Sequence, residues 1–136
     1  MNRSFYRIGG LSISLMLLVA GCTQTSIQPM AQDTFLVSTN AAPACGPNGT
    51  RNVAFKSAAI EVIRRGGDLF IISQDNTDTS LQGDIFTGMY TNYSQGMVVR
   101  LIQPNTPEAA NALSARQTLG ANWQQIVAEG APTTCA

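Results

Sequence analysis

An amphipathic stretch at residues 50–67, TRNVAFKSAAIEVIRRGG, constrains the fold more than any other part of the chain. Apolar residues recur along it at helical spacing, and polar residues fill the other side. The apolar stripe comprises Phe55, Ala58, Ala59, Val62 and Ile63, and the polar side comprises Lys56, Ser57, Glu61 and Arg64. We predict a helix that starts near Thr50 or Asn52, pairs Glu61 with Arg65 and ends at Gly66-Gly67. Its alanines would allow close packing.

Strand signals lie on both sides of this helix. Residues 33–39, DTFLVST, are rich in β-branched and aromatic side chains, and residues 69–72, LFII, are four consecutive apolar residues. The first pattern is typical of a strand, and the second of a strand buried on both faces. Strand, helix and strand in succession predict a βαβ-like unit, whose crossover is right-handed if the two strands are parallel.

The remaining segments predict loops, two more strands and two more helices. The predicted loops are 40–50 and 75–84, the strands are 85–93 and 97–102 with a turn at 94–96, and the helices are 106–119 and 123–130. Together the elements predict an α+β fold. Its sheet would have about four strands in β-α-β-β-β-α order, with the helices on one face.

The amino-terminal residues have the layout of an export signal. Two basic residues, Arg3 and Arg7, precede an uncharged apolar run from residue 8 to residue 20. That run is shorter than the roughly 20 apolar residues that a helix needs to cross a bilayer. We therefore interpret it as a signal peptide.

The sequence directly after this run, Val19-Ala20-Gly21-Cys22, resembles the bacterial lipobox. Resemblance to lipoproteins of the signal peptidase II type implies that residues 1–21 are removed and that Cys22 carries acyl chains such as palmitate. Three chains anchor a protein stably where one is marginal. Thr23 stands where aspartate would favour the inner membrane, so the resemblance implies lipid anchoring in the outer membrane, at its periplasmic face. The alternative is an ordinary secretory peptide with a chance cysteine.

The resemblance divides the chain into a signal peptide (1–21), a lipidated tether (22–32) and a single α+β domain (33–136). The predicted tether is uncharged and without a clear period, and it contains Pro29. A tether of this kind would let the domain stand off the membrane. About 115 residues remain after processing, enough for one domain with a modest core.

If Cys22 is lipidated, two of the three cysteines remain, Cys45 and Cys135. The periplasm is oxidising, so we interpret this pair as one disulfide that ties the carboxyl terminus to the loop after the first strand. Two free thiols or a redox pair are the alternative, but the Cys-x-x-Cys spacing is missing.

The charge of the processed chain argues against nucleic acid as a partner. Arg3 and Arg7 account for two of the eight basic residues, so processing leaves six against eight acidic residues. A chain with a net charge near −2 has no basic stripe with which to displace phosphate counterions.

The chain has no histidine, which removes Ser-His-Asp and Cys-His catalysis and His-rich metal sites. Asp75, Asp78 and Asp84 lie in a predicted loop, and paired carboxylates can serve glycoside hydrolysis or bind calcium. The EF-hand spacing is not met, because Thr77 and Thr79 stand where acids belong. We predict a solvated loop, no catalytic residue, no metal site and no cofactor.

Aromatic residues and methionine cluster at positions 85–97 and suggest a contact surface. Alternation places Ile85, Met89 and Tyr93 on one face of a strand, and Phe86, Gly88 and Tyr90 on the other. Aromatic residues and methionine are enriched at protein interfaces, so Phe86, Tyr90 and Tyr93 are candidate contact residues. Filling of the core by both faces is the alternative.

The layout of lipobox, early cysteine, alanine-bearing helix and buried strand is similar to that of small outer-membrane lipoproteins of the stress-sensor and accessory type. The four cysteines of the stress-sensor lipoproteins are not present in this chain. The resemblance therefore assigns no functional residue to it. We expect a non-enzymatic lipoprotein that contacts an envelope protein in envelope assembly, secretion or stress sensing. The alternatives are an enzyme that acts on cell-wall glycan through the loop carboxylates and a small-ligand-binding module.

Overall fold

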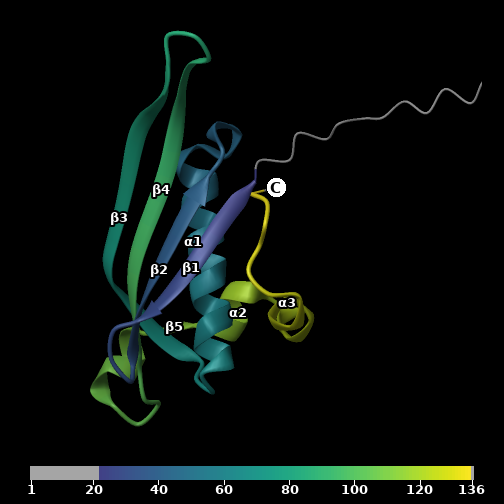
Figure 1. Cartoon of the computed structure of the whole chain (residues 1–136). Helices are drawn as coiled ribbons and strands as arrows, with labels where there is room; N and C mark the ends of the chain where they lie inside the picture. Colours follow the sequence, from purple (N-terminus) through teal and green to yellow (C-terminus); the bar gives the residue numbers. More distant parts are fainter. Residues whose placement is uncertain (1–21, 136) are drawn as a thin grey trace, which may run out of the picture.

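A computed structural model describes residues 22–135 as a five-stranded antiparallel sheet with helices on one face (Figure 1). The predicted signal peptide, residues 1–21, lies outside the described residues. The strand order is β1-β2-β4-β3-β5. The strands are β1 (Thr23–Pro29), β2 (Thr34–Ala41), β3 (Leu69–Asp84), β4 (Gly88–Leu101) and β5 (Leu113–Ser114). The predicted α+β class is confirmed, although the order of elements differs and the sheet has one more strand than expected.

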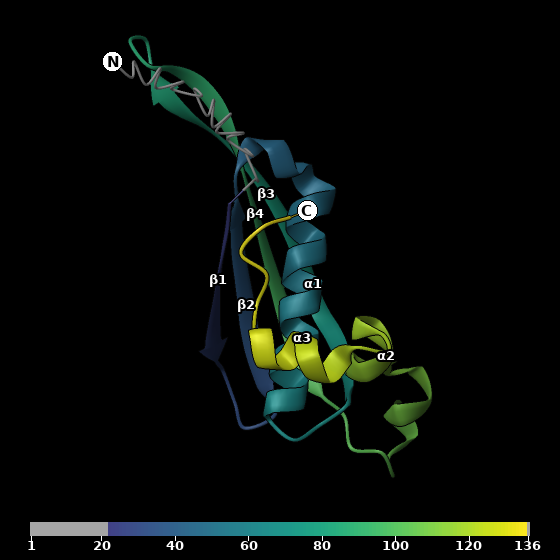
Figure 2. The same cartoon turned by 90° about the vertical axis from the view of Figure 1, so that its right-hand side faces the viewer.

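The long helix α1 (Gly46–Arg64) packs across one face of the sheet (Figure 2). Two short helices, α2 (Ala115–Leu119) and α3 (Trp123–Glu129), pack against α1 on the side away from the sheet. Strands β2 and β3, which flank α1 in the sequence, both run antiparallel to β4. They are therefore parallel to each other, and β4 lies between them in a split βαβ unit.

The core fills the space between α1 and the sheet. Its fully buried residues are Phe35, Val37, Ala54, Ala58, Ala59, Val62, Phe70, Met97, Val99 and Ala115. Strand residues in this set alternate along each strand, as expected for a sheet with one packed face. The complete burial of Ala58 and Ala59 agrees with the close packing predicted for this helix.

Helix α1 has the predicted apolar stripe on the core, and it ends just before Gly66-Gly67 as predicted. The predicted ion pair is present, with 3.0 Å between Arg65 Nε and Glu61 Oε1. Ser57, predicted on the polar side, is instead buried, and its hydroxyl donates to the carbonyl of Val53 at 2.7 Å. That position is covered because α1 is packed by other elements on both sides, the sheet on one and α2 and α3 on the other.

The predicted tether is wrong, because residues 23–29 form the edge strand β1. This strand pairs antiparallel with β2 from Thr23 opposite Ala41 to Pro29 opposite Phe35. Thr25 and Thr39 share a hydrogen bond of 2.9 Å between their hydroxyls, and Ile27 packs on the core. The alternation of polar and β-branched residues in TQTSI is a weak strand pattern that low hydrophobicity concealed.

The predicted loop at 40–50 is largely helical instead, because the 3₁₀ helix η1 (Pro43–Cys45) leads directly into α1. Because α1 starts at Gly46, the predicted helix start at Thr50 lies inside the helix, and the Thr50 hydroxyl donates to the carbonyl of Gly46 at 2.7 Å. A β-carbon at Gly49 would lie 3.4 Å from the β-carbons of both Cys45 and Cys135. The disulfide therefore packs against the first turn of α1, directly beside Gly49.

The predicted loop at 75–84 and the predicted turn at 94–96 are also wrong. Residues 75–84 continue β3, residues 94–96 lie inside β4, and the two strands pair from Phe70 opposite Leu101 to Asp84 opposite Gly88. A bulge at Ser73 shifts the alternation of β3 by one residue, so the apolar pattern of its first half stops there.

The helix predicted at 106–119 is broken into three elements. These are the 3₁₀ helix η2 (Pro107–Asn111), strand β5 and helix α2. Asp68 causes the break: its backbone carbonyl accepts from the amide of Ala115 at 2.8 Å, and its carboxylate accepts from Ser114 and from the amide of Arg116. Such long-range bonds leave no local pattern. The short helix predicted at 123–130 is confirmed as α3.

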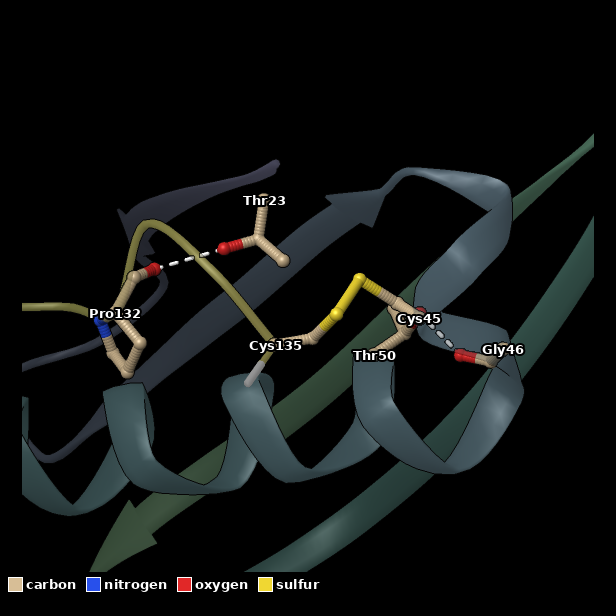
Figure 3. Close-up of a disulfide and its surroundings, with 6 residues drawn as sticks. All are labelled: Thr23, Cys45, Gly46, Thr50, Pro132 and Cys135. Atoms are coloured by element: carbon tan, nitrogen blue, oxygen red, sulfur yellow. Dashed lines mark hydrogen bonds between the residues drawn. A yellow bond between two sulfur atoms is a disulfide. The ribbon is translucent and has the colours of Figure 1, made fainter. Parts of the chain in front are cut away.

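The predicted disulfide between Cys45 and Cys135 is confirmed, with 5.6 Å between the two α-carbons (Figure 3). It holds the carboxyl-terminal tail against the start of α1. The same tail bonds to the start of β1, where the Thr23 amide donates to the carbonyl of Thr133 at 2.9 Å and the Thr23 hydroxyl donates to that of Pro132 at 2.9 Å. The two ends of the described chain are thus joined on one side of the molecule.

We expect the Cys45→Ala/Cys135→Ala variant to lose about 3–5 kcal/mol of its free energy of unfolding, because the bridge closes a loop of 90 residues. Urea unfolding with and without a reducing agent measures the loss. A variant as stable as the parent chain would contradict this role. Cys22→Ala is the matched control, since this cysteine lies outside the bridge, and reductant should destabilise that variant as much as the parent.

Candidate functional site

Strands β3 and β4 extend past the rest of the sheet as a two-stranded arm (Figures 1 and 2). Strand β2 ends at Ala41, opposite Tyr93, and Tyr93 lies opposite Thr79. Residues 80–92, which we call the arm, continue beyond this row, and no other strand of the described chain pairs with them. From Thr79 to the last pair at Asp84 the arm is about 17 Å long, at about 3.3 Å per residue.

The tip of the arm is a turn with its own hydrogen bonds. The carboxylate of Asp84 accepts from the amides of Thr87 at 2.7 Å and Phe86 at 2.8 Å, and from the Thr87 hydroxyl at 2.9 Å. These hydrogen bonds lower the pKa of the Asp84 carboxyl below its usual value, and the bond from the Thr87 amide has the largest effect. Gly83 and Gly88, on either side of the turn, both have positive φ, which glycine adopts without steric cost.

Large apolar side chains are displayed on this turn and beside it. Ile85 is 91% exposed and Phe86 is 90% exposed, while Leu81, Met89 and Tyr90 are at least half exposed. Full burial of a side chain such as Phe or Ile against a partner is worth about 1.5–3 kcal/mol. We call the described residues outside the arm the body. The turn therefore holds two strongly apolar groups at the point farthest from the body, where only an external surface could cover them.

The three candidate contact residues are placed differently from one another. Phe86 lies in the turn, Tyr90 lies on the face of β4 that points away from α1, and Tyr93 lies half-buried at the base of the arm. Tyr93 alternates with the buried Gln95 and Met97, so it shares the α1 face. The predicted separation of Tyr90 and Tyr93 by face is confirmed.

Leu81 and the role of Asp84 were not predicted, because residues 75–84 were expected to form a loop. Two signals could have found the arm. Thr77, Thr79 and Leu81 alternate at strand spacing, and Asp84-Ile85-Phe86-Thr87-Gly88 fits a three-residue hairpin connection that ends on glycine.

A polar network fixes the base of the arm to α1. Arg51 of α1 forms an ion pair with Asp75 of β3, with 2.7 Å between Nη2 and Oδ2. The other oxygen of Asp75 accepts from the side-chain amide of Gln95, which is buried, and the Gln95 carbonyl accepts from the Thr77 hydroxyl at 2.6 Å. Every polar group of the Gln95 side chain that faces the core is thereby bonded.

The three aspartates of the glycan-enzyme alternative do not form a pair. Asp75 and Asp78 are about 10 Å apart along β3 and lie on opposite faces, while Asp84 is at the tip, about 20 Å further along. Retaining and inverting glycosidases place their two carboxyl groups about 5–9.5 Å apart on one site. Between residues 22 and 135, no cluster of three or more His, Cys, Asp or Glu could hold a metal ion.

Two open cavities lie on the body. One of about 560 Å³ is lined by Arg65, Arg116 and neighbouring backbone, and another of about 260 Å³ is lined by Phe55, Lys56 and the carboxyl-terminal tail. Neither contains a residue of the arm. The exposed apolar side chains of the arm therefore form a projecting surface and not the lining of either cavity.

Cys22 is exposed at the start of β1, and its backbone is bonded into the body. In the described part of the chain, no helix is long and apolar enough to cross a membrane. No family model, curated protein or solved structure matches this chain.

We expect Gly83→Ala to disorder the arm while the body stays folded. The new β-carbon would lie 2.1 Å from the carbonyl oxygen of Gly88, and the φ of +123° is unfavourable for any other residue. Gly96→Ala is the matched control, because that glycine is in the same strand pair with open space around it and no positive φ. Amide hydrogen exchange should rise by an order of magnitude or more in the arm of the first variant alone. Equal protection in both variants would contradict a turn that depends on glycine at position 83.

Proposed function

We propose that this chain is a lipid-anchored protein of the bacterial outer membrane that acts without catalysis, through contacts between its arm and another envelope protein. The lipobox-like sequence at Cys22 supports the anchoring and the periplasmic location. The tip of the arm carries the proposal of a protein contact, since the turn holds Ile85 and Phe86 almost fully exposed.

Three properties of the arm favour a protein-binding role. The arm is held rigid by a bonded turn at one end and by the network of Asp75 and Gln95 at the other, so little order is lost on binding. Its exposed residues include the aromatic and methionine side chains that interfaces favour. Its open strand edges can also accept a strand from a partner.

The anchor is tested by mass analysis of the protein purified from its own membranes. We expect a chain that begins at Cys22 and carries acyl chains, and we expect Cys22→Ala to leave the membrane fraction. A bare cysteine, or a leader still attached, would contradict the anchored form of the proposal.

The contact is tested by a photo-crosslinking amino acid placed at Phe86 in the full-length protein in living cells. We expect a discrete protein adduct at this position, which disappears when Ile85 is changed to Ser in the same chain. Met30 is the matched control position, because it is also exposed and apolar but lies in the turn between β1 and β2. An equal set of adducts from Phe86 and Met30, or none from Phe86, would argue against a specific contact.

A further inference from the structure

The proposed anchor and the arm leave the body at the same end of the sheet. Thr23 pairs with Ala41, Ala41 with Tyr93 and Tyr93 with Thr79, so these four residues form one row across four strands. Cys22 lies just beyond this row on the β1 side. The arm starts just beyond the same row on the β4 and β3 side (Figure 1).

Cys22 is also joined to the body without a spacer. Its carbonyl accepts from the amide of Ala42 at 3.0 Å, and it bridges Thr134 of the carboxyl-terminal tail. The next residue of that tail, Cys135, is fixed by the disulfide, and Thr23 bonds to Pro132 (Figure 3). A lipid on Cys22 would therefore hold this end of the body directly at the membrane surface.

The tip of the arm cannot be far from the anchor. Strands in a sheet are about 4.8 Å apart, which puts β4 and β3 about 10–14 Å from β1. The arm adds about 17 Å along the strands, so the tip lies within roughly 25 Å of Cys22. Because the arm leaves the same end of the sheet as Cys22, a body that Cys22 holds at the membrane has its arm on the side that faces the membrane.

Lipid alone is a poor environment for the arm. Both of its outer edges present N–H and C=O groups that no strand of the described chain pairs, and hydrocarbon offers them no hydrogen bonds. Asp84 and the nearby Asp78 are acidic, and no lysine or arginine occurs from residue 66 to residue 99. An anionic lipid surface would therefore repel this part of the chain.

We infer that the partner of the arm is an integral membrane protein of the membrane that holds Cys22. An apolar pocket in that protein, at the depth of the lipid headgroups, would receive Ile85 and Phe86. Polar groups around the pocket would bond to the open strand edges, which lipid cannot do. This inference rests on the proposed function and adds the location and class of the partner.

The test uses the mature chain with Cys22→Ser, so that membrane binding does not depend on acyl chains. This chain keeps all five strands and the disulfide, and the described bonds of Cys22 use its backbone. The chain is co-sedimented with outer-membrane vesicles of the producing bacterium, opened by freezing and thawing so that their periplasmic face is accessible, and with protein-free liposomes made from the lipids of those vesicles. We expect the affinity for the vesicles to be at least about tenfold higher than the affinity for the liposomes.

The variants show whether such binding uses the arm. Ile85→Ser/Phe86→Ser should weaken vesicle binding about tenfold, and Met30→Ser should not change it. Both sites are exposed, and circular dichroism checks that each variant is folded. Protease treatment of the vesicles before mixing should abolish binding.

Two results would overturn the inference. If the chain binds liposomes as strongly as vesicles, the arm binds lipid and not a protein. If the arm variants bind vesicles as the parent does, the partner of the arm is not an integral membrane protein. A discrete crosslink from Phe86 to a soluble periplasmic protein in cells would then still support the proposed function. Loss of both the crosslink and the vesicle binding would overturn the proposed function as well.

Discussion

Strand β4 is paired along its length, and this pairing joins the body to the arm. β2 pairs with one side of it over the body, and β3 pairs with the other side from the core to the tip. The buried residues Met97 and Val99 of β4 pack under α1, and the same strand then continues to Tyr90 in solvent. The arm therefore takes its direction from the packed core.

This continuity explains how a two-stranded arm can be ordered. An isolated hairpin is marginal in water, because closing it costs entropy that two strands without a core barely offset. In this chain the body aligns the strands before the arm begins, and Arg51, Asp75 and Gln95 close its base with hydrogen bonds. Asp84 then satisfies the amides of the turn. The apolar tip is therefore presented on a turn in which the amides of Phe86 and Thr87 are bonded.

Elements with one buried face could be predicted from the sequence. Helix α1, strand β2 and the inner part of β3 have apolar residues at regular spacing because they pack on the core, and their patterns predicted them. The pairing of Cys45 with Cys135 followed from their number once Cys22 was set aside. Local pattern and residue count were enough in these cases.

Elements without a core face, or whose ends depend on distant residues, could not be predicted in this way. The outer half of β3 is solvated on both faces, so polar residues suit it as well as they suit a loop, and the bulge at Ser73 breaks the alternation. The break between η2 and α2 depends on Asp68, far away in the sequence. For the candidate site, aromatic content pointed to Phe86 and Tyr90, but only the register shows that they stand on a projecting arm.

Cys22 lies close to Thr134 and Cys135, so the two ends of the described part of the chain are almost in contact. Joining these ends and opening the turn between β1 and β2 would give a circular permutant with the same packing. An anchoring cysteine placed at the new amino terminus would then stand at the opposite end of the sheet. Under the proposed anchoring, the arm would then point away from the bilayer, so the topology of the chain, and not its core, would set which way the domain faces.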